Sequence, residues 1–483
     1  MDKLFSILLA VAMLCTFIAC DTVTIENKSE ETIHSEEIIP LPPGETVHVT
    51  TQAVAVQTDP PATTKEPIPY ERDDGGFTIS VNENGEATII GYSGSVANLE
   101  VPATLEGHPV VAIGDKVFLQ SKTLKNVKIQ AGIKSIGRLA FWDCSVLVGI
   151  ELPETLTTIG ESAFEQNDKL LTAELPTNLT TIGDKAFFGC TYLRDVTIPE
   201  KTTYIGVRAF SGCKRILHMT IPVGVTELSE SVFNDCTFLK SVTLPDTLTS
   251  IGDDAFSSCY ALESIEIPAS VTKIGEGAFY SCDTLTKVTI PEGVTEIEEY
   301  TLACCEKLET IVLPATIEQI DPTAFYDNKA LVRFDVAKNN MHYVSDENGY
   351  LFNKDMTELC MVTTTVPAHY EIPASVTKID AYAFYRRENL TSVVIPDGVS
   401  HIGKSAFQMC NLTNVEIPAS VVQIDAEAFN NCKQLSVITI LGTATKFSDN
   451  VFRHCTNLTI KCHPGSPAER HAQNNGHAVE HIG

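Results

Sequence analysis

The chain has 483 residues, of which 43% are hydrophobic and 20% are charged, and its formal net charge is −28. A charge this negative argues against binding to nucleic acids or to anionic membrane surfaces, because both would repel the protein. The single tryptophan argues against a binding surface built on tryptophan anchors. The length would suggest two or three domains, but the repeats described below replace that estimate.

Residues 1–20 are typical of an export signal. Leu4–Ile18 is almost continuously apolar and follows Lys3, and such a run is short for a membrane span. The ending Phe17-Ile18-Ala19-Cys20 resembles a bacterial lipoprotein signal, which implies that Cys20 becomes the lipidated first residue after cleavage. The alternative is an ordinary secretory signal with an unmodified cysteine. Lipidation predicts a protein that is anchored in the cell membrane through its lipid alone and is exposed outside the cell.

Two further segments precede the repeats. Residues 21–74 are rich in Thr, Pro and acidic residues, and their low apolar content predicts a disordered tether. Residues 75–117 are expected to form an N-terminal cap, because a terminal unit must cover an apolar end. Within this cap we expect strands at Phe77–Val81 and Ala87–Tyr92, with Asn84-Gly85 in the turn between them.

Between residues 118 and 331 a unit of 23 residues repeats without interruption. Its pattern is C-x-x-L-x-x-I-x-I-P-x-x-V-T-x-I-G-x-x-A-F, as seen at Cys259–Phe279. A phenylalanine column carries the period through fourteen units, with Leu at one place, one step of 59 residues and one of 22: Phe118, Phe141, Phe164, Phe187, Phe210, Phe233, Phe256, Phe279, Leu302, Phe325, Phe384, Phe407, Phe429 and Phe452. A fixed period of this length predicts a solenoid, in which each unit buries apolar residues only against its neighbours.

Each part of the unit predicts a local structure. The stretch L-x-x-I-x-I alternates apolar and polar residues, which favours a strand with one buried face. The following proline ends that strand, because it cannot donate a ladder hydrogen bond. The segment V-x-x-I is expected to be a second short strand, and the glycine after it to permit a bend. The A-F pair is expected in a short helical or 3₁₀ turn.

Ten of the fifteen cysteines fall at one place in the unit: Cys144, Cys190, Cys213, Cys236, Cys259, Cys282, Cys305, Cys410, Cys432 and Cys455. Asn167 and Asn328 replace cysteine at this place in two copies. A residue that alternates with asparagine is better suited to a small buried site beside a backbone turn than to a disulfide. The column therefore predicts free, buried thiols, while Cys304, Cys360 and Cys462 stay unassigned.

The repeated signature resembles the BspA-like branch of the leucine-rich repeat family over roughly residues 75–483. This resemblance implies a leucine-rich repeat solenoid, mainly β, with N- and C-terminal caps. It is specific for the fold but says little about the function, because one fold serves many functions. In this family surface display and binding to other proteins are expected.

Two segments depart from the period. In residues 332–371 we expect a β-hairpin insertion, with strands at 342–344, 350–352 and 358–362, before a second repeat block at 372–460. In residues 461–483 we expect a C-terminal cap. Ser466-Pro467-Ala468-Glu469 is a helix-start signal, and a strand at 478–482 should follow the helix.

The exposed face of the first strands is the candidate partner-binding face, since a solenoid presents an extended surface there. Its candidate residues flank the buried isoleucine position: Glu151, Glu174, Asp195, Thr197, His218, Thr220, Thr243, Glu266, Lys287, Thr289, Arg333 and Asp335. Threonine also suits strands for conformational reasons alone. A second candidate surface consists of aromatic residues beside the ladder: Phe188, Tyr260, Tyr280, Tyr326 and Tyr385.

The search for catalytic motifs gives none, so we expect no enzymatic activity, no cofactor and no metal. Asp346-Glu347-Asn348-Gly349 has the wrong spacing for a calcium loop and is expected to be a polar hairpin turn. His463, His471, His477 and His481 have spacings that fit no familiar zinc pattern. We expect them to be solvated residues of the cap.

Three functions remain open. The first is a surface-displayed monomer that binds protein partners, as an adhesin or host-interaction factor. The second is a carbohydrate-binding or scaffolding protein of the producer's own cell envelope, although glycan sites usually use exposed aromatics and the main strands offer none. The third, an enzyme, has only the 332–371 segment and the histidine-rich end in its favour.

Overall fold

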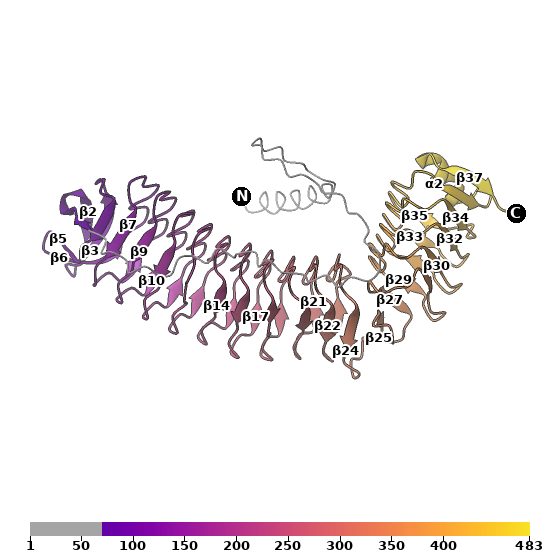
Figure 1. The fold of residues 1–483 in the computed structure, drawn as a ribbon, viewed down its shortest axis with the longest axis horizontal. Helices are drawn as coiled ribbons and strands as arrows, with labels where there is room; N and C mark the ends of the chain where they lie inside the picture. Colours follow the sequence, from indigo (N-terminus) through magenta and orange to yellow (C-terminus); the bar gives the residue numbers. More distant parts are fainter. Residues whose placement is uncertain (1–69) are drawn as a thin grey trace, which may run out of the picture. The chain divides into compact units, whose positions relative to one another are not determined.

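The computed structural model describes residues 70–483. The predicted signal with Cys20 and the tether up to residue 69 lie outside the described residues. The described chain winds into a β-solenoid of about 17 turns of about 23 residues, which confirms the predicted fold class (Figure 1). Within the described part, no helix is long and apolar enough to cross a membrane.

The first strand of each coil stacks in parallel on the first strand of the next coil. The register follows the repeat, so that Thr220 lies opposite Thr243. This first ladder consists of β1 (Glu71–Arg72), β4 (Asn98–Val101), β7 (Asn126–Ile129), β9 (Gly149–Glu151) and β11 (Thr172–Glu174); β14 (His218–Thr220), β16 (Ser241–Thr243) and β18 (Ser264–Ile265); β20 (Lys287–Thr289), β22 (Thr310–Leu313) and β24 (Arg333–Val336); and β28 (His369–Glu371), β30 (Ser392–Val394), β32 (Asn414–Ile417), β34 (Val437–Ile440), β36 (Thr459–Cys462) and β37 (Ala478–His481).

The second strand of each coil forms a second ladder. It consists of β2 (Phe77–Val81), β3 (Ala87–Tyr92), β6 (His108–Ile113), β8 (Ser135–Ile136), β10 (Thr158–Ile159), β12 (Thr181–Ile182) and β13 (Tyr204–Ile205), with β5 (Thr104–Leu105) beside β6; β15 (Glu227–Leu228), β17 (Ser250–Ile251) and β19 (Lys273–Ile274); β21 (Glu296–Ile297) and β23 (Gln319–Ile320); and β25 (Tyr343–Ser345), β26 (Leu351–Asn353), β27 (Glu358–Met361), β29 (Lys378–Ile379), β31 (His401–Ile402), β33 (Gln423–Ile424) and β35 (Lys446–Phe447).

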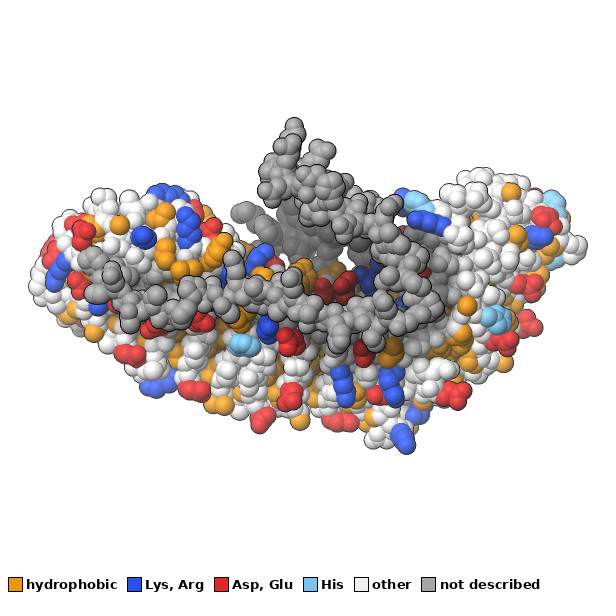
Figure 2. Space-filling model, viewed as in Figure 1, with side chains coloured by type: hydrophobic (Ala, Val, Ile, Leu, Met, Phe, Trp, Pro, Cys, Tyr) orange, Lys and Arg blue, Asp and Glu red, His pale blue; other side chains and the backbone are white. Residues whose placement is uncertain are grey.

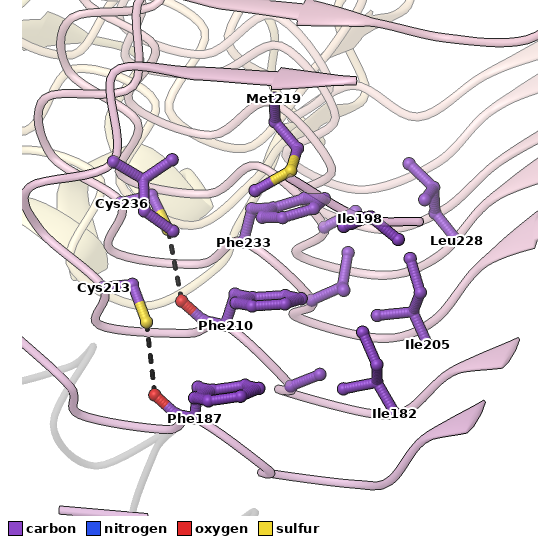
Figure 3. Close-up of a cluster of buried hydrophobic side chains, with 14 of the residues drawn as sticks. Ile182, Phe187, Ile198, Ile205, Phe210, Cys213, Met219, Leu228, Phe233 and Cys236 are labelled. Atoms are coloured by element: carbon purple, nitrogen blue, oxygen red, sulfur yellow. Dashed lines mark hydrogen bonds between the residues drawn. The ribbon is translucent and has the colours of Figure 1, made fainter. Parts of the chain in front are cut away.

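The phenylalanine and cysteine columns lie inside the coils (Figure 3). The rings of Phe187 and Phe210 stack with centroids 5.4 Å apart and planes inclined by 6°. The Cys213 thiol donates a hydrogen bond to the Phe187 carbonyl at 3.2 Å, and the Asn167 amide does the same to the Phe141 carbonyl at 2.8 Å. The ten column cysteines are buried and free, as predicted, and Cys304, Cys360 and Cys462 are free as well.

The turn after the second strand is not helical, contrary to our expectation. Ser162 and Gln166 have φ values of 54° and 63°, and such left-handed residues recur in most coils and stop a helix from propagating. The glycine in the turn serves close packing rather than a left-handed bend. A Cβ on Gly183 would lie 2.7 Å from the main-chain nitrogen of Glu161 in the preceding coil.

The two ends of the solenoid are capped. The hairpin of β2 and β3 matches the expected strands and pairs antiparallel. The predicted boundary at residue 74 lies too late, because β1 falls within the proposed tether and pairs with β4. At the other end, α2 (Pro467–Asn475) begins as predicted, with the Ser466 hydroxyl accepting from the Glu469 N–H. The described chain also forms a short 3₁₀ turn, η1 (Asp74–Gly76), before β2.

The 332–371 segment proves to be one enlarged coil. It contains the predicted hairpin strands β25 and β26, which pair antiparallel, and Asp346 closes the turn between them by accepting from the Tyr350 N–H at 2.8 Å. The regular ladder continues to Val336 at its start and resumes at His369, so the coil spans 36 residues between the starts of β24 and β28. Val362 occupies the phenylalanine place of this coil, since its carbonyl accepts hydrogen bonds from the next coil as those of Phe residues do elsewhere.

The enlarged coil also divides the core in two. Buried residues up to Phe334, with Leu351 and Met361, form a first core. Tyr350, Phe352 and the buried residues of the later coils form a second core. Neighbouring side chains of β26 therefore serve different cores, as expected for a strand whose residues alternate between two faces.

Candidate functional site

The first-strand face presents two outward rows of side chains around one buried row. In β14, buried Met219 lies between exposed His218 and Thr220. Of the predicted face residues, Asp335 is half-buried and the others are exposed: Glu151, Glu174, Asp195, Thr197, His218, Thr220, Thr243, Glu266, Lys287, Thr289 and Arg333. Alternation along the strand therefore identified the outward positions correctly.

Several charges on this face are paired locally. Lys128 Nζ lies 3.5 Å from a carboxylate oxygen of Glu151, and Arg333 forms an ion pair with Asp335. The Nδ1 atom of His218 hydrogen-bonds the Ser241 hydroxyl at 2.8 Å. Most of these groups are exposed, so each pair adds little to stability. The face is suited to polar contacts with a partner, and Figure 2 likewise shows acidic and basic side chains interspersed along the coils.

The first ladder is interrupted at one predicted strand. The coil that carries Asp195 and Thr197 has no strand in the first ladder, where β11 of one neighbouring coil and β14 of the other are separated. Asp195 adopts a φ of 54°, a left-handed conformation that aspartate tolerates better than most residues. Val196 and Ile198 still point into the core. The apolar alternation thus predicted burial correctly but not the strand.

Of the second predicted surface, Tyr326 and Tyr385 are buried, Phe188 and Tyr280 are half-buried, and Tyr260 is exposed. Tyr326 and Tyr385 are each only 7% exposed, and their hydroxyls lie 2.5 Å apart. Tyr280, Tyr300 and Tyr382 pack around them. Burial raises the pKa of Tyr385 to about 12. This tyrosine cluster joins the coils on either side of the enlarged coil, so it is structural, and Tyr260 is the exposed member of the predicted set.

Exposed apolar residues also lie at the edge of the first ladder, and of these the sequence analysis identified Tyr260 alone. Tyr192, Leu217, Phe238 and Tyr260 come from four successive coils and are 48%, 46%, 54% and 44% exposed. We call these four residues the edge patch. A usable signal was present, because Tyr192 and Phe238 both lie two residues after a column cysteine, in the loop before the strand.

Hydrogen bonds between coils hold the edge patch in place. The Phe238 N–H donates to the Lys214 carbonyl at 3.3 Å and the Lys240 N–H donates to the Leu217 carbonyl at 2.8 Å. The Arg215 guanidinium lies 5.1 Å from the centre of the Tyr192 ring. Exposed aromatic side chains on successive coils, with a cationic group beside one of them, have the chemistry of a protein-binding hot spot.

The C-terminal histidines are not all solvated, which corrects the prediction. His471 stacks on Phe447 with ring centroids 4.7 Å apart, and His477 packs edge-on against Phe452. Burial lowers the pKa of both histidines. His481 bonds Glu469 at 2.9 Å. Across residues 70–483, no three His, Cys, Asp or Glu side chains are placed to hold a metal ion.

Comparison with known proteins supports the family assignment. The model of the BspA type leucine rich repeat region matches residues 111–240, 213–332 and 366–465. A leucine-rich repeat protein from Bacteroides ovatus is 25% identical, with 84% of this chain and 98% of that chain covered and a TM-score of 0.59. A leucine rich cell surface protein from Faecalibacterium prausnitzii is 25% identical, with 87% and 96% covered and a TM-score of 0.47. A comparison with curated proteins gives no match. The chain belongs to the BspA-type leucine-rich repeat family, which is typical of bacterial surface proteins.

Proposed function

We propose that the protein is a lipid-anchored surface protein of a bacterium that binds protein partners, as an adhesin or host-interaction factor. The edge patch carries this proposal. Exposed apolar side chains scattered singly are ordinary, but neighbouring ones on a rigid scaffold are typical of interaction sites. The family's surface display and the lipoprotein-like segment ending at Cys20 support the location.

The patch and the polar face offer complementary contacts. Leu217 directly precedes His218 of β14, and Phe238 lies three residues before β16. A partner that covers the patch would therefore also reach the first-strand face. Aromatic anchors would supply most of the affinity, and the surrounding threonines and paired charges would supply specificity.

Binding of the purified protein to an array of matrix proteins and glycans tests the proposal. We expect saturable binding to at least one protein. Joint replacement Tyr192→Ala, Phe238→Ala and Tyr260→Ala should weaken it at least about a hundredfold, because each lost anchor costs about tenfold or more. Val422→Ala, which truncates a side chain 54% exposed in the second block, is the matched control.

Two results would count against the proposal. Binding that the triple variant leaves intact would remove the edge patch as the site. Binding to glycans alone would favour the carbohydrate-binding alternative. Labelling of intact cells with palmitate tests the anchor separately, since Cys20→Ala should abolish incorporation of the lipid.

A further inference from the structure

A cavity of about 340 Å³ lies where the second ladder breaks, between β23 and the β25–β27 strands. These strands belong to the enlarged coil and follow β24 in Figure 1. Phe325, Leu351 and Met361 give the cavity apolar walls, and four carboxylates also line it: Glu318, Asp321, Glu358 and Asp380. The break in the ladder thus creates a space that is both apolar and acidic.

The carboxylates outnumber the cations around this cavity. Lys378 is ion-paired with Glu358 and with Asp380, the latter at 3.2 Å. Among the described residues, Glu318 and Asp321 have no cationic partner within ion-pair distance. Burial raises the pKa of Asp380, against the opposing effect of Lys378. The site therefore keeps an excess of negative charge that a cation would offset.

The strand beside the cavity also has unused main-chain acceptors. In the regular coils such groups are paired: the Thr295 carbonyl accepts from the Glu318 N–H at 2.8 Å and the Ile297 carbonyl accepts from the Asp321 N–H at 2.9 Å. Within residues 70–483, β23 pairs with β21 alone, and no hydrogen bond reaches the equivalent carbonyls of Glu318 and Ile320. The Ile320 N–H is satisfied by the Tyr343 hydroxyl at 3.0 Å instead of a strand.

These features favour an extended organic cation over a metal ion. No three acidic, histidine or cysteine side chains in the described chain converge closely enough for a metal. A lysine or arginine side chain has an apolar stem for the walls and a cationic end for the carboxylates. The peptide main chain that carries it can donate to the free edge of β23, as in strand addition.

We propose that this cavity binds a lysine or arginine side chain presented by an extended basic segment of a protein partner. The proposal deepens the proposed function, on which it rests for the source of the segment. The site is distinct from the edge patch, so the two can be tested independently.

Fluorescence anisotropy of a labelled, end-capped peptide, Gly-Gly-Lys-Gly-Lys-Gly-Gly, titrated with the full chain tests this assignment at physiological salt. We expect saturable binding of one peptide per chain. The combined variant Glu318→Gln and Asp321→Asn should weaken it at least about tenfold, because charged hydrogen bonds are lost. Asparagine at 321 can still accept from Thr323, which Asp321 caps at 2.8 Å.

The matched control is Glu296→Gln, which removes the same charge from an exposed residue of β21, the neighbouring strand. An equal loss of peptide affinity in this control would mean that the peptide is attracted to the acidic protein as a whole, and it would overturn the assignment to the cavity. Glu318→Lys changes an exposed residue without disturbing the core and should abolish binding. Retained binding in this variant would also overturn the assignment.

Further probes separate the source of the cation. The same peptide with glutamine in place of lysine should not bind, and the arginine version should bind. Binding of 1,5-diaminopentane without binding of either basic peptide would overturn the peptide assignment. If the peptides fail to bind while a protein of the array still binds, the cavity proposal is wrong and the proposed function stands. If the lysine peptide binds while no protein of the array does, the cavity proposal stands and the proposed function is wrong.

Discussion

Each coil presents the same small set of buried side chains to its neighbour, so each position of the unit recurs in a similar environment along the chain. The column thiols show what this demands. They are buried and donate to a carbonyl of the preceding coil, as Cys236 does to Phe210 at 3.3 Å. Asn167 reproduces that contact, which explains why the two residue types alternate.

The buried thiols predict a loss of stability at alkaline pH. Burial raises the pKa of Cys144 and of Cys410 to about 12, above the ordinary value of 9.0. Above pH 9 the unfolded chain therefore releases protons that the folded chain keeps, and stability falls by about 1.4 kcal/mol per thiol and pH unit.

Thermal unfolding between pH 8 and 10.5 checks this prediction. The melting temperature should drop steeply above pH 9. Replacing Cys213, Cys236 and Cys259 by alanine should make that drop shallower, even if it lowers the melting temperature at pH 8. An unchanged slope would assign the effect to the tyrosines instead.

Arg387 takes the cysteine place at the start of the second block. It is 5% exposed, and its Nε and Nη2 atoms donate to the Val362 carbonyl at 3.1 and 2.9 Å while Nη1 donates to the Tyr385 carbonyl at 3.1 Å. Burial lowers its pKa to about 10. In this irregular coil the longer arginine side chain donates hydrogen bonds to main-chain carbonyls, as a cysteine thiol does in the regular coils.

We expect Arg387→Met to destabilise the second block by about 1–3 kcal/mol, because it leaves buried carbonyls without a donor. Urea unfolding followed by hydrogen exchange of residues 358–385 measures the effect. Arg453→Met, at an exposed arginine in the same block, is the control and should change stability little.

At the scale of elements, the caps show how the ends of the array are closed. Helix α2 packs on β35, β36 and β37, and its His471 lies against Phe447. The ladder continues through β37, which pairs with β36. The cap therefore covers the last coil with a helix whose half-buried histidine is sensitive to pH.

Acidification should loosen this cap. Burial lowers the folded pKa of His471 and His477 below their ordinary value of 6.5, so the unfolded state binds protons first. The stability from these residues is complete above about pH 6.5 and is lost as the pH falls towards the folded pKa.

Hydrogen exchange at pH 7 and pH 5, corrected for intrinsic rates, tests this prediction. Residues 459–481 should lose protection at pH 5, and the combined His471→Gln and His477→Gln variant should lose the pH difference. Asp254 and Asp283 have pKa values raised to about 6 by burial, which favours stability on acidification, but they lie in the first block. Equal loss of protection in both blocks would contradict the assignment to the cap.

At the scale of the whole described chain, two cores meet at the enlarged coil. Coupling in a repeat array acts between neighbours. Here it passes through β26 and through the tyrosine cluster, with Asp327 ion-paired to Arg386 at 2.8 Å across the same junction. A junction with fewer regular ladder bonds is the place where cooperativity should be weakest.

We therefore expect Phe407→Ala to separate the unfolding of the two blocks. Loss of a buried phenylalanine costs about 3–5 kcal/mol, and this cost falls on the second core. Urea unfolding monitored by hydrogen exchange should show residues 366–462 unfolding before residues 118–334. Phe210→Ala should reverse the order, and one common transition for both variants would show that the junction couples the cores fully.

The sequence alone determined the solenoid, most of its strands and the buried columns. These features depend on contacts between residues one period apart, and the period is visible in the chain. Alternation also identified the outward residues of the first-strand face. At Asp195 and in the turns near Ser162 a residue adopts a left-handed backbone conformation. There the pattern predicted correctly which side chains are buried, but it predicted the wrong secondary structure.

Only the tertiary structure decided how the irregular coil is built and what it creates. The sequence could not show that Val362 stands for phenylalanine, that Tyr326 and Tyr385 are buried, or that β23 keeps a free edge beside acidic side chains. These features depend on how a 36-residue coil fits between regular ones. Loop residues have no alternation to reveal which way they point, so of the edge patch only Tyr260 was among the predicted surface residues.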